Sequence, residues 1–138
     1  MTLAAELTDV LFLVGRVLFA AVLGYLALGN LLDLEGTVGY AQSKGAPFPS
    51  ISVPLSSGLV VIGAMSILVG AYPLVGGLII GGFLTIITPI MHDFWNADGM
   101  DRQTEQISFL KNVGLAGGAL LLASLASTDW PYALGIGL

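Results

Sequence analysis

The sequence contains no cysteine and very little charge. Only four Lys or Arg and nine Asp or Glu occur among its 138 residues, so 9% of the chain is charged, whereas soluble domains average about 25%. The lack of cysteine excludes disulfides, thiolate catalysis and cysteine-ligated metals. With four basic side chains and a net charge of −5, the chain offers no basic surface to phosphates, so nucleic acid is not an expected partner.

Four long apolar stretches make up most of the sequence. They cover residues 10–32, 53–71, 74–91 and 107–128, and the charged side chains within them are Arg16 and Lys111. Each stretch has the roughly 17–25 residues that an α-helix needs to cross the hydrocarbon core of a bilayer. The sequence therefore predicts an all-α fold, an integral membrane four-helix transmembrane bundle in one domain over residues 1–138, placed as a multi-pass protein in the cell membrane and surrounded by lipids.

The polar residues collect at one end of this predicted bundle. Because four spans bring the chain back to its starting side, residues 33–52 and 92–106 meet at one end, which we call the loop end. The termini and the Tyr72-Pro73 turn share the other, the terminal end. Counting Lys111, the loop end carries nine of the thirteen charged side chains and the single histidine. Polar chemistry is expected there, and residues 37–44 are expected to form a short helix at the interface.

The distribution of basic residues gives an orientation. Three of the four basic residues lie at the loop end, which by the positive-inside rule predicts that this end is cytoplasmic. The excess of acidic over basic side chains is unusual for a membrane protein. It is typical of proteins from organisms with high internal salt, so a halophilic archaeon is one interpretation of the source.

Lys111 is a charged residue about one turn inside the last span, where its long side chain can reach back toward the loop end. Asp93, Asp98 and Glu105 are its candidate partners. One interpretation is a salt bridge that fixes the third loop to the last helix. The other is a binding site in which Lys111, His92 and Asn112 donate hydrogen bonds to an anion or to a quinone oxygen.

His92 is the natural proton carrier of the chain, since histidine gains and loses a proton most readily near neutral pH. Asp93 follows it directly and is placed to orient the ring or to extend a proton relay. The alternative is that His92 caps the third span and that Trp95 belongs to an interfacial aromatic belt. His92, Asp93 and Lys111 are the catalytic candidates if the chain is an enzyme, which the sequence leaves open. No recognised metal-ligand spacing occurs, so neither a metal nor an intrinsic cofactor is expected.

Arg16 stands apart, two turns into the first span and near the terminal end. One interpretation is that it reaches carbonyl groups at the ends of the second or fourth span. The other is that it binds a ligand, because charges inside spans often mark functional sites. The glycines of the third and fourth spans favour close packing of helices within the chain, with contact between copies in a homo-oligomer as the alternative.

Several of these motifs together resemble the DoxX family of small membrane proteins. They are Arg16 with Gly24, Tyr40 followed by Lys44-Gly45-Ala46-Pro47-Phe48-Pro49, His92-Asp93-Phe94-Trp95, and Gln106-x-x-Phe109-x-Lys111-Asn112-x-x-Leu115-x-Gly117-Gly118. The resemblance implies four membrane helices in this order. The sequence departs from the family pattern at Asn30, near the position where many relatives carry a lysine. A role for that lysine is therefore not transferred to this chain. Some relatives resemble subunits of thiosulfate:quinone oxidoreductase, others associate with oxidative-stress enzymes, and distant ones act as membrane chaperones or cargo receptors.

Two functional hypotheses follow. The first is a redox-linked subunit that binds quinone at the loop end beside an oxidoreductase partner subunit. The second is a non-enzymatic membrane scaffold or chaperone, or a conduit for a small solute. The predicted ligand-binding residues are Lys111, Asn112, His92, Trp95 and Arg16.

Overall fold

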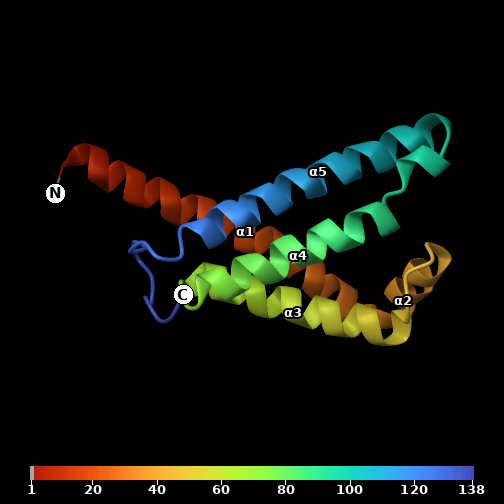
Figure 1. The fold of residues 1–138 in the computed structure, drawn as a ribbon, viewed down its shortest axis with the longest axis horizontal. Helices are drawn as coiled ribbons and strands as arrows, with labels where there is room; N and C mark the ends of the chain where they lie inside the picture. Colours follow the sequence, from red (N-terminus) through yellow and green to blue (C-terminus); the bar gives the residue numbers. More distant parts are fainter. Residues whose placement is uncertain (1) are drawn as a thin grey trace.

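The structure is a computed structural model that describes residues 2–138. It consists of helices joined by short connections (Figure 1). In chain order the helices are α1 (Leu3–Leu32), α2 (Leu34–Ser43), α3 (Pro49–Val69), α4 (Pro73–Met91), the short 3₁₀ helix η1 (Phe94–Asn96) and α5 (Gly99–Ser124).

The four long helices, α1, α3, α4 and α5, are each long and apolar enough to cross a membrane. They confirm the predicted all-α bundle of four membrane-spanning helices. α1 packs mainly on α3, α3 on α4, and α4 on α5. Figure 1 shows the loop end on the right, where α2 and the connection from α4 to α5 lie, and the terminal end on the left.

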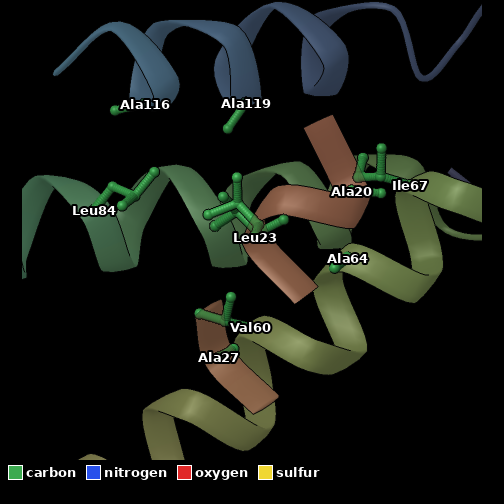
Figure 2. Packing of buried hydrophobic residues seen from close by; sticks show 10 residues of the cluster. Ala20, Leu23, Ala27, Val60, Ala64, Ile67, Leu84, Ala116 and Ala119 are labelled. Atoms are coloured by element: carbon green, nitrogen blue, oxygen red, sulfur yellow. The ribbon is translucent and has the colours of Figure 1, made fainter. Parts of the chain in front are cut away.

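Small and branched side chains form the core where the four helices meet (Figure 2). Ile67 of α3, Ile80 of α4 and Ala119 of α5 are each 0% exposed. Ala20 and Leu23 of α1 reach the same cluster from the other side. This dry core fills the middle of the bundle.

Some of the glycines bring helices close together inside the chain. A Cβ atom added at Gly76 of α4 would lie 3.0 Å from the carbonyl oxygen of Gly63 in α3, and one at Gly77 would lie 2.7 Å from the carbonyl oxygen of Ala119 in α5. These positions need glycine because backbone occupies the space of a side chain. Gly114 and Gly117 of α5, in contrast, have no neighbour within 4 Å of such an atom.

Three helix boundaries differ from those predicted. α1 begins at Leu3, because the Thr2 side chain accepts a hydrogen bond from the amide of Ala5 and caps the helix ahead of the apolar stretch. α3 begins at Pro49, ahead of the predicted apolar stretch 53–71, and includes Pro54 within the helix. α5 begins at Gly99, before the apolar stretch, because a helix outside the hydrocarbon core can continue through polar residues.

The interfacial helix predicted at residues 37–44 exists as α2, at slightly different bounds. The side chain of Asp33 caps it by accepting a hydrogen bond from the amide of Gly36 at 3.2 Å. α2 packs chiefly against α3, with Ala41 buried between them. It therefore covers the loop end of the bundle next to the end of α4.

Candidate functional site

Four polar side chains from three segments meet at the loop end. Lys44, at the end of α2, places its Nζ 3.2 Å from Oδ1 of Asp93 and 4.0 Å from Oε1 of Glu105. The other oxygen of Glu105 lies 3.0 Å from Nδ1 of His92. Asp93 also accepts a hydrogen bond from Asn96. We call Lys44, His92, Asp93 and Glu105 the loop-end network.

The local structure explains why these groups meet. α4 ends at Met91, so His92 and Asp93 leave the helix axis and face the first turns of α5, where Glu105 lies. α2 folds back over the same region and presents Lys44. Partial burial opposes the charge of Lys44, but its hydrogen bond to Asp93 and the charges of its neighbours outweigh this, so the pKa of Lys44 is raised above its usual value.

The loop-end network joins the end of α2 to the end of α4 and to α5. Its side chains are about a quarter exposed. Replacing Lys44 with methionine is therefore expected to lower the free energy of unfolding by only about 0.5–1 kcal/mol, because solvent screens partly exposed ion pairs. The matched substitution Lys111→Met is expected to cause no measurable change. Equilibrium unfolding in mixed micelles would measure both, and an equal loss in both variants would contradict this assignment of partners.

A half-open cavity of about 290 Å³ adjoins this network, and His92 belongs to both. All five α-helices contribute to its lining. Its apolar side chains come from the middle and the loop end of the bundle and are Leu23, Leu26, Ala27, Ala41, Val53, Val60, Phe83, Leu84, Ile87, Met91 and Leu115. Ligand pockets span about 300–1,000 Å³ and combine apolar walls with a few convergent polar groups, so the volume of this cavity lies just below that range.

The polar lining groups come from α1, α2, α3 and α5 and from His92, which follows the end of α4. They are Asn30, Thr37, Tyr40, Ser56, Ser57, His92 and Asn112. Asn30 of α1 donates to the hydroxyl of Ser57 in α3 at 3.4 Å, and Ser57 is 2% exposed. No Lys, Arg, Asp or Glu lines the cavity within residues 2–138. A charged ligand would therefore find no countercharge on these walls, whereas a neutral ligand with hydrogen-bond acceptors would fit them.

His92 links the cavity to the loop-end network. It lines the cavity while Nδ1 of its ring is held by Glu105. The other ring nitrogen has no hydrogen-bond partner among the residues that the structure describes. One ring nitrogen is therefore free to form a hydrogen bond with a group in the cavity, and the other can exchange a proton with Glu105.

The predicted site residues divide into two groups. His92 and Asn112 line the cavity, and Asp93 belongs to the network above it. Lys111 is exposed and forms no ion pair within residues 2–138, so the predicted bridge to Asp93, Asp98 or Glu105 is wrong. Lys44 forms the ion pair with Asp93 instead, because α2 folds over the end of α4, whereas Lys111 is exposed.

Trp95 lies outside the cavity in an aromatic cluster. Its ring centroid is 5.3 Å from that of Phe94 and 6.0 Å from that of Phe109, with edge-to-face geometry. Such pairs stabilise contacts beyond the area they bury. Trp95 thus helps to hold η1 against α5.

Arg16 lies at the opposite end of the molecule and is 1% exposed. Its Nη1 and Nη2 donate to the carbonyl oxygens of Pro131 at 2.8 Å and Tyr132 at 2.5 Å. The guanidinium also lies over the rings of Phe12 and Trp130, at 5.9 and 5.6 Å from their centroids. Both carbonyls belong to the C-terminal tail, residues 125–138. The prediction that Arg16 reaches carbonyl groups at a helix end is therefore wrong.

The C-terminal tail, which Arg16 binds, folds back onto the turn between α3 and α4. The amide of Leu134 donates to the carbonyl of Val69 at 2.8 Å, and the amide of Tyr72 donates to the carbonyl of Ile136 at 2.7 Å. Arg16 is therefore a structural anchor of the terminal end, far from the cavity.

Sequence reasoning missed Asn30, Tyr40 and Ser57 of the cavity, and Lys44 of the network. A signal was present for two of them, because Asn30 and Ser57 are polar side chains within apolar stretches. In a membrane such side chains usually face the bundle interior or a neighbouring helix.

Comparison with known proteins gives consistent matches. A model of the DoxX family matches residues 11–93. The chain is 34% identical to the inner membrane protein YphA of Escherichia coli (strain K12) over 119 residues, which cover 83% of this chain and 81% of YphA. It is 30% identical to the inner membrane protein YqjF of the same organism over 118 residues, which cover 86% and 85% of the two chains. No solved structure matches it.

Proposed function

This chain belongs to the DoxX family of multi-pass cell-membrane proteins, and we propose that it binds a quinone in the loop-end cavity as the membrane subunit of a redox enzyme. The observation that carries the proposal is the cavity itself. It is apolar, free of charged lining groups within residues 2–138, and provided with hydrogen-bond donors from several helices. A quinone is a neutral, lipid-soluble ring whose two carbonyl oxygens accept hydrogen bonds.

The donors around the cavity have separate roles in this proposal. The amides of Asn30 and Asn112 and the hydroxyl of Tyr40 are positioned to orient the carbonyl oxygens of the ring. Such hydrogen bonds are stronger beside apolar walls of low dielectric constant than in bulk water. The apolar walls, including Phe83 and Leu84, exclude water and hold the faces of the ring.

The loop-end network supplies the route for protons. A bound quinone becomes a quinol by taking up two electrons and two protons, and the electrons come from the partner redox enzyme. His92 delivers a proton from its free ring nitrogen and regains one through Glu105, which lies 3.0 Å from Nδ1. Lys44 and Asp93 connect Glu105 to the aqueous surface of the loop end.

Equilibrium titration tests the proposal. The purified chain in lipid nanodiscs is titrated with decylubiquinone, and bound quinone is measured by equilibrium dialysis. We expect one saturable site per chain. Asn112→Leu is expected to weaken binding by about tenfold, since one buried hydrogen bond contributes about 1–1.5 kcal/mol.

The matched control is Gln103→Leu, which changes an exposed amide side chain on the same helix. Its binding is expected to equal that of the unmodified chain. Uptake that rises linearly with quinone concentration, without saturation, would overturn the proposal. That result would favour a membrane scaffold over a conduit, since the packed core around Ile67, Ile80 and Ala119 closes the middle of the bundle in the part of the chain that the structure describes.

A further inference from the structure

A second hollow adjoins the cavity on the lipid-facing side of α3 and α4. Its volume is about 330 Å³, and its own lining includes Leu59 of α3 and Ile79, Ile86 and Ile90 of α4. Ile86 is 68% exposed and Leu59 is 41% exposed, so the hollow opens toward the hydrocarbon that surrounds membrane-spanning helices. We call it the α3/α4 groove.

The groove and the cavity share one wall. Val53, Ser56, Phe83 and Ile87 line both, together with Ala41 of α2. These side chains separate a chamber with polar donors from a groove whose lining is almost entirely apolar. Movement of Phe83 or Ile87 to another rotamer would join the two spaces.

The shape of the groove indicates what occupies it. Ile79 and Ile90 both line it, and the eleven steps from one position to the other rise about 16 Å along a helix. A hollow of this length, with apolar walls and one open side, accommodates a hydrocarbon chain better than a ring. The C-terminal end of α2 and Pro47 cover its loop end, so a chain leaving the cavity is directed along the helices toward the bilayer centre.

We propose that the α3/α4 groove binds the hydrocarbon tail of the ligand whose head occupies the cavity. The ligand class is therefore a long-tailed lipid quinone that enters from the membrane between α3 and α4. This inference rests on the proposed function, because it assigns the tail of the quinone placed there. Continuity with the cavity through five shared residues favours the ligand's own tail over an unrelated lipid chain.

The test compares two quinones with the same head. Ubiquinone-0 has no tail and decylubiquinone has a ten-carbon tail, and the ratio of their dissociation constants defines the tail advantage. Ile79→Trp fills the groove at a residue that does not line the cavity. It is expected to reduce the tail advantage by at least about tenfold, which corresponds to the burial of two methylene groups, while leaving the affinity for ubiquinone-0 unchanged.

Leu78→Trp is the matched control, because Leu78 is the neighbouring residue of α4, is 52% exposed and lines neither hollow. Partition of the tail into lipid cancels between the two variants. An equal tail advantage in both variants, with ubiquinone-0 still bound, would overturn the groove assignment and leave the proposed function standing. Failure of the unmodified chain to bind either quinone would overturn both.

Discussion

Replacing Arg16 with leucine is expected to release the C-terminal tail from the bundle. The guanidinium donates to two tail carbonyls, those of Pro131 and Tyr132. Hydrogen bonds to a charged group contribute about 1.5–3 kcal/mol each, so loss of both should weaken docking of the tail by about 3 kcal/mol. Hydrogen exchange of the amides of Leu134 and Gly135, which the docked tail protects, is then expected to accelerate about a hundredfold.

Two further variants make this prediction specific. Arg16→Lys keeps the charge but not the planar fork, so it is expected to satisfy one carbonyl and give an intermediate rate. Arg102→Leu changes an exposed arginine on α5 and is expected to leave the exchange of the tail unchanged. Unaltered exchange in Arg16→Leu would show that the backbone hydrogen bonds to the α3–α4 turn hold the tail without Arg16.

The membrane-spanning helices are predictable from the sequence because the bilayer imposes a length. Apolar stretches of sufficient length identify α1, α3, α4 and α5 whatever their partners are. Their polar ends are less predictable. α5 continues through Asp101 and Glu105 into the loop end, since helix formation outside hydrocarbon depends on capping and tertiary contact and not on hydropathy.

The rotation of each helix could not be predicted in the same way. Soluble helices reveal their buried face by hydrophobic periodicity, but a membrane helix is apolar on the lipid side too. Lys111 and Asn112 are neighbours in sequence, yet Asn112 lines the cavity and Lys111 is exposed. This missing signal explains why the sequence placed Lys111 and Asn112 in one site, whereas only Asn112 lines the cavity.

Long-range contacts were the other missing information. Lys44 reaches Asp93 only because α2 folds back over the end of α4 while it packs on α3. Arg16 finds its partners in the tail, which in sequence is only a connector after the last apolar stretch. Because four spans bring the chain back to its starting side, the gathering of polar residues at one end was predictable from the sequence. Which of these residues pair with one another could be seen only in the folded structure.

Filling the cavity is expected to have the largest effect on ligand binding. Ala27 of α1 is 3% exposed and lines the cavity between α1 and α3. In Ala27→Phe the added ring occupies space that the quinone ring needs. The resulting steric overlap is expected to weaken decylubiquinone binding by more than about a hundredfold, or about 3 kcal/mol.

Ala21→Phe is the matched control, because Ala21 lies on the same helix but is exposed and lines neither hollow. Circular dichroism and gel filtration of both variants would establish that each retains the folded bundle.

The ratio of the decylubiquinone dissociation constants of Ala27→Phe and Ala21→Phe tests the central claim most directly, since the two variants differ only in where the same ring is placed. A quinone site in the loop-end cavity predicts a ratio above about 100. A ratio near one, with both variants folded, would contradict it.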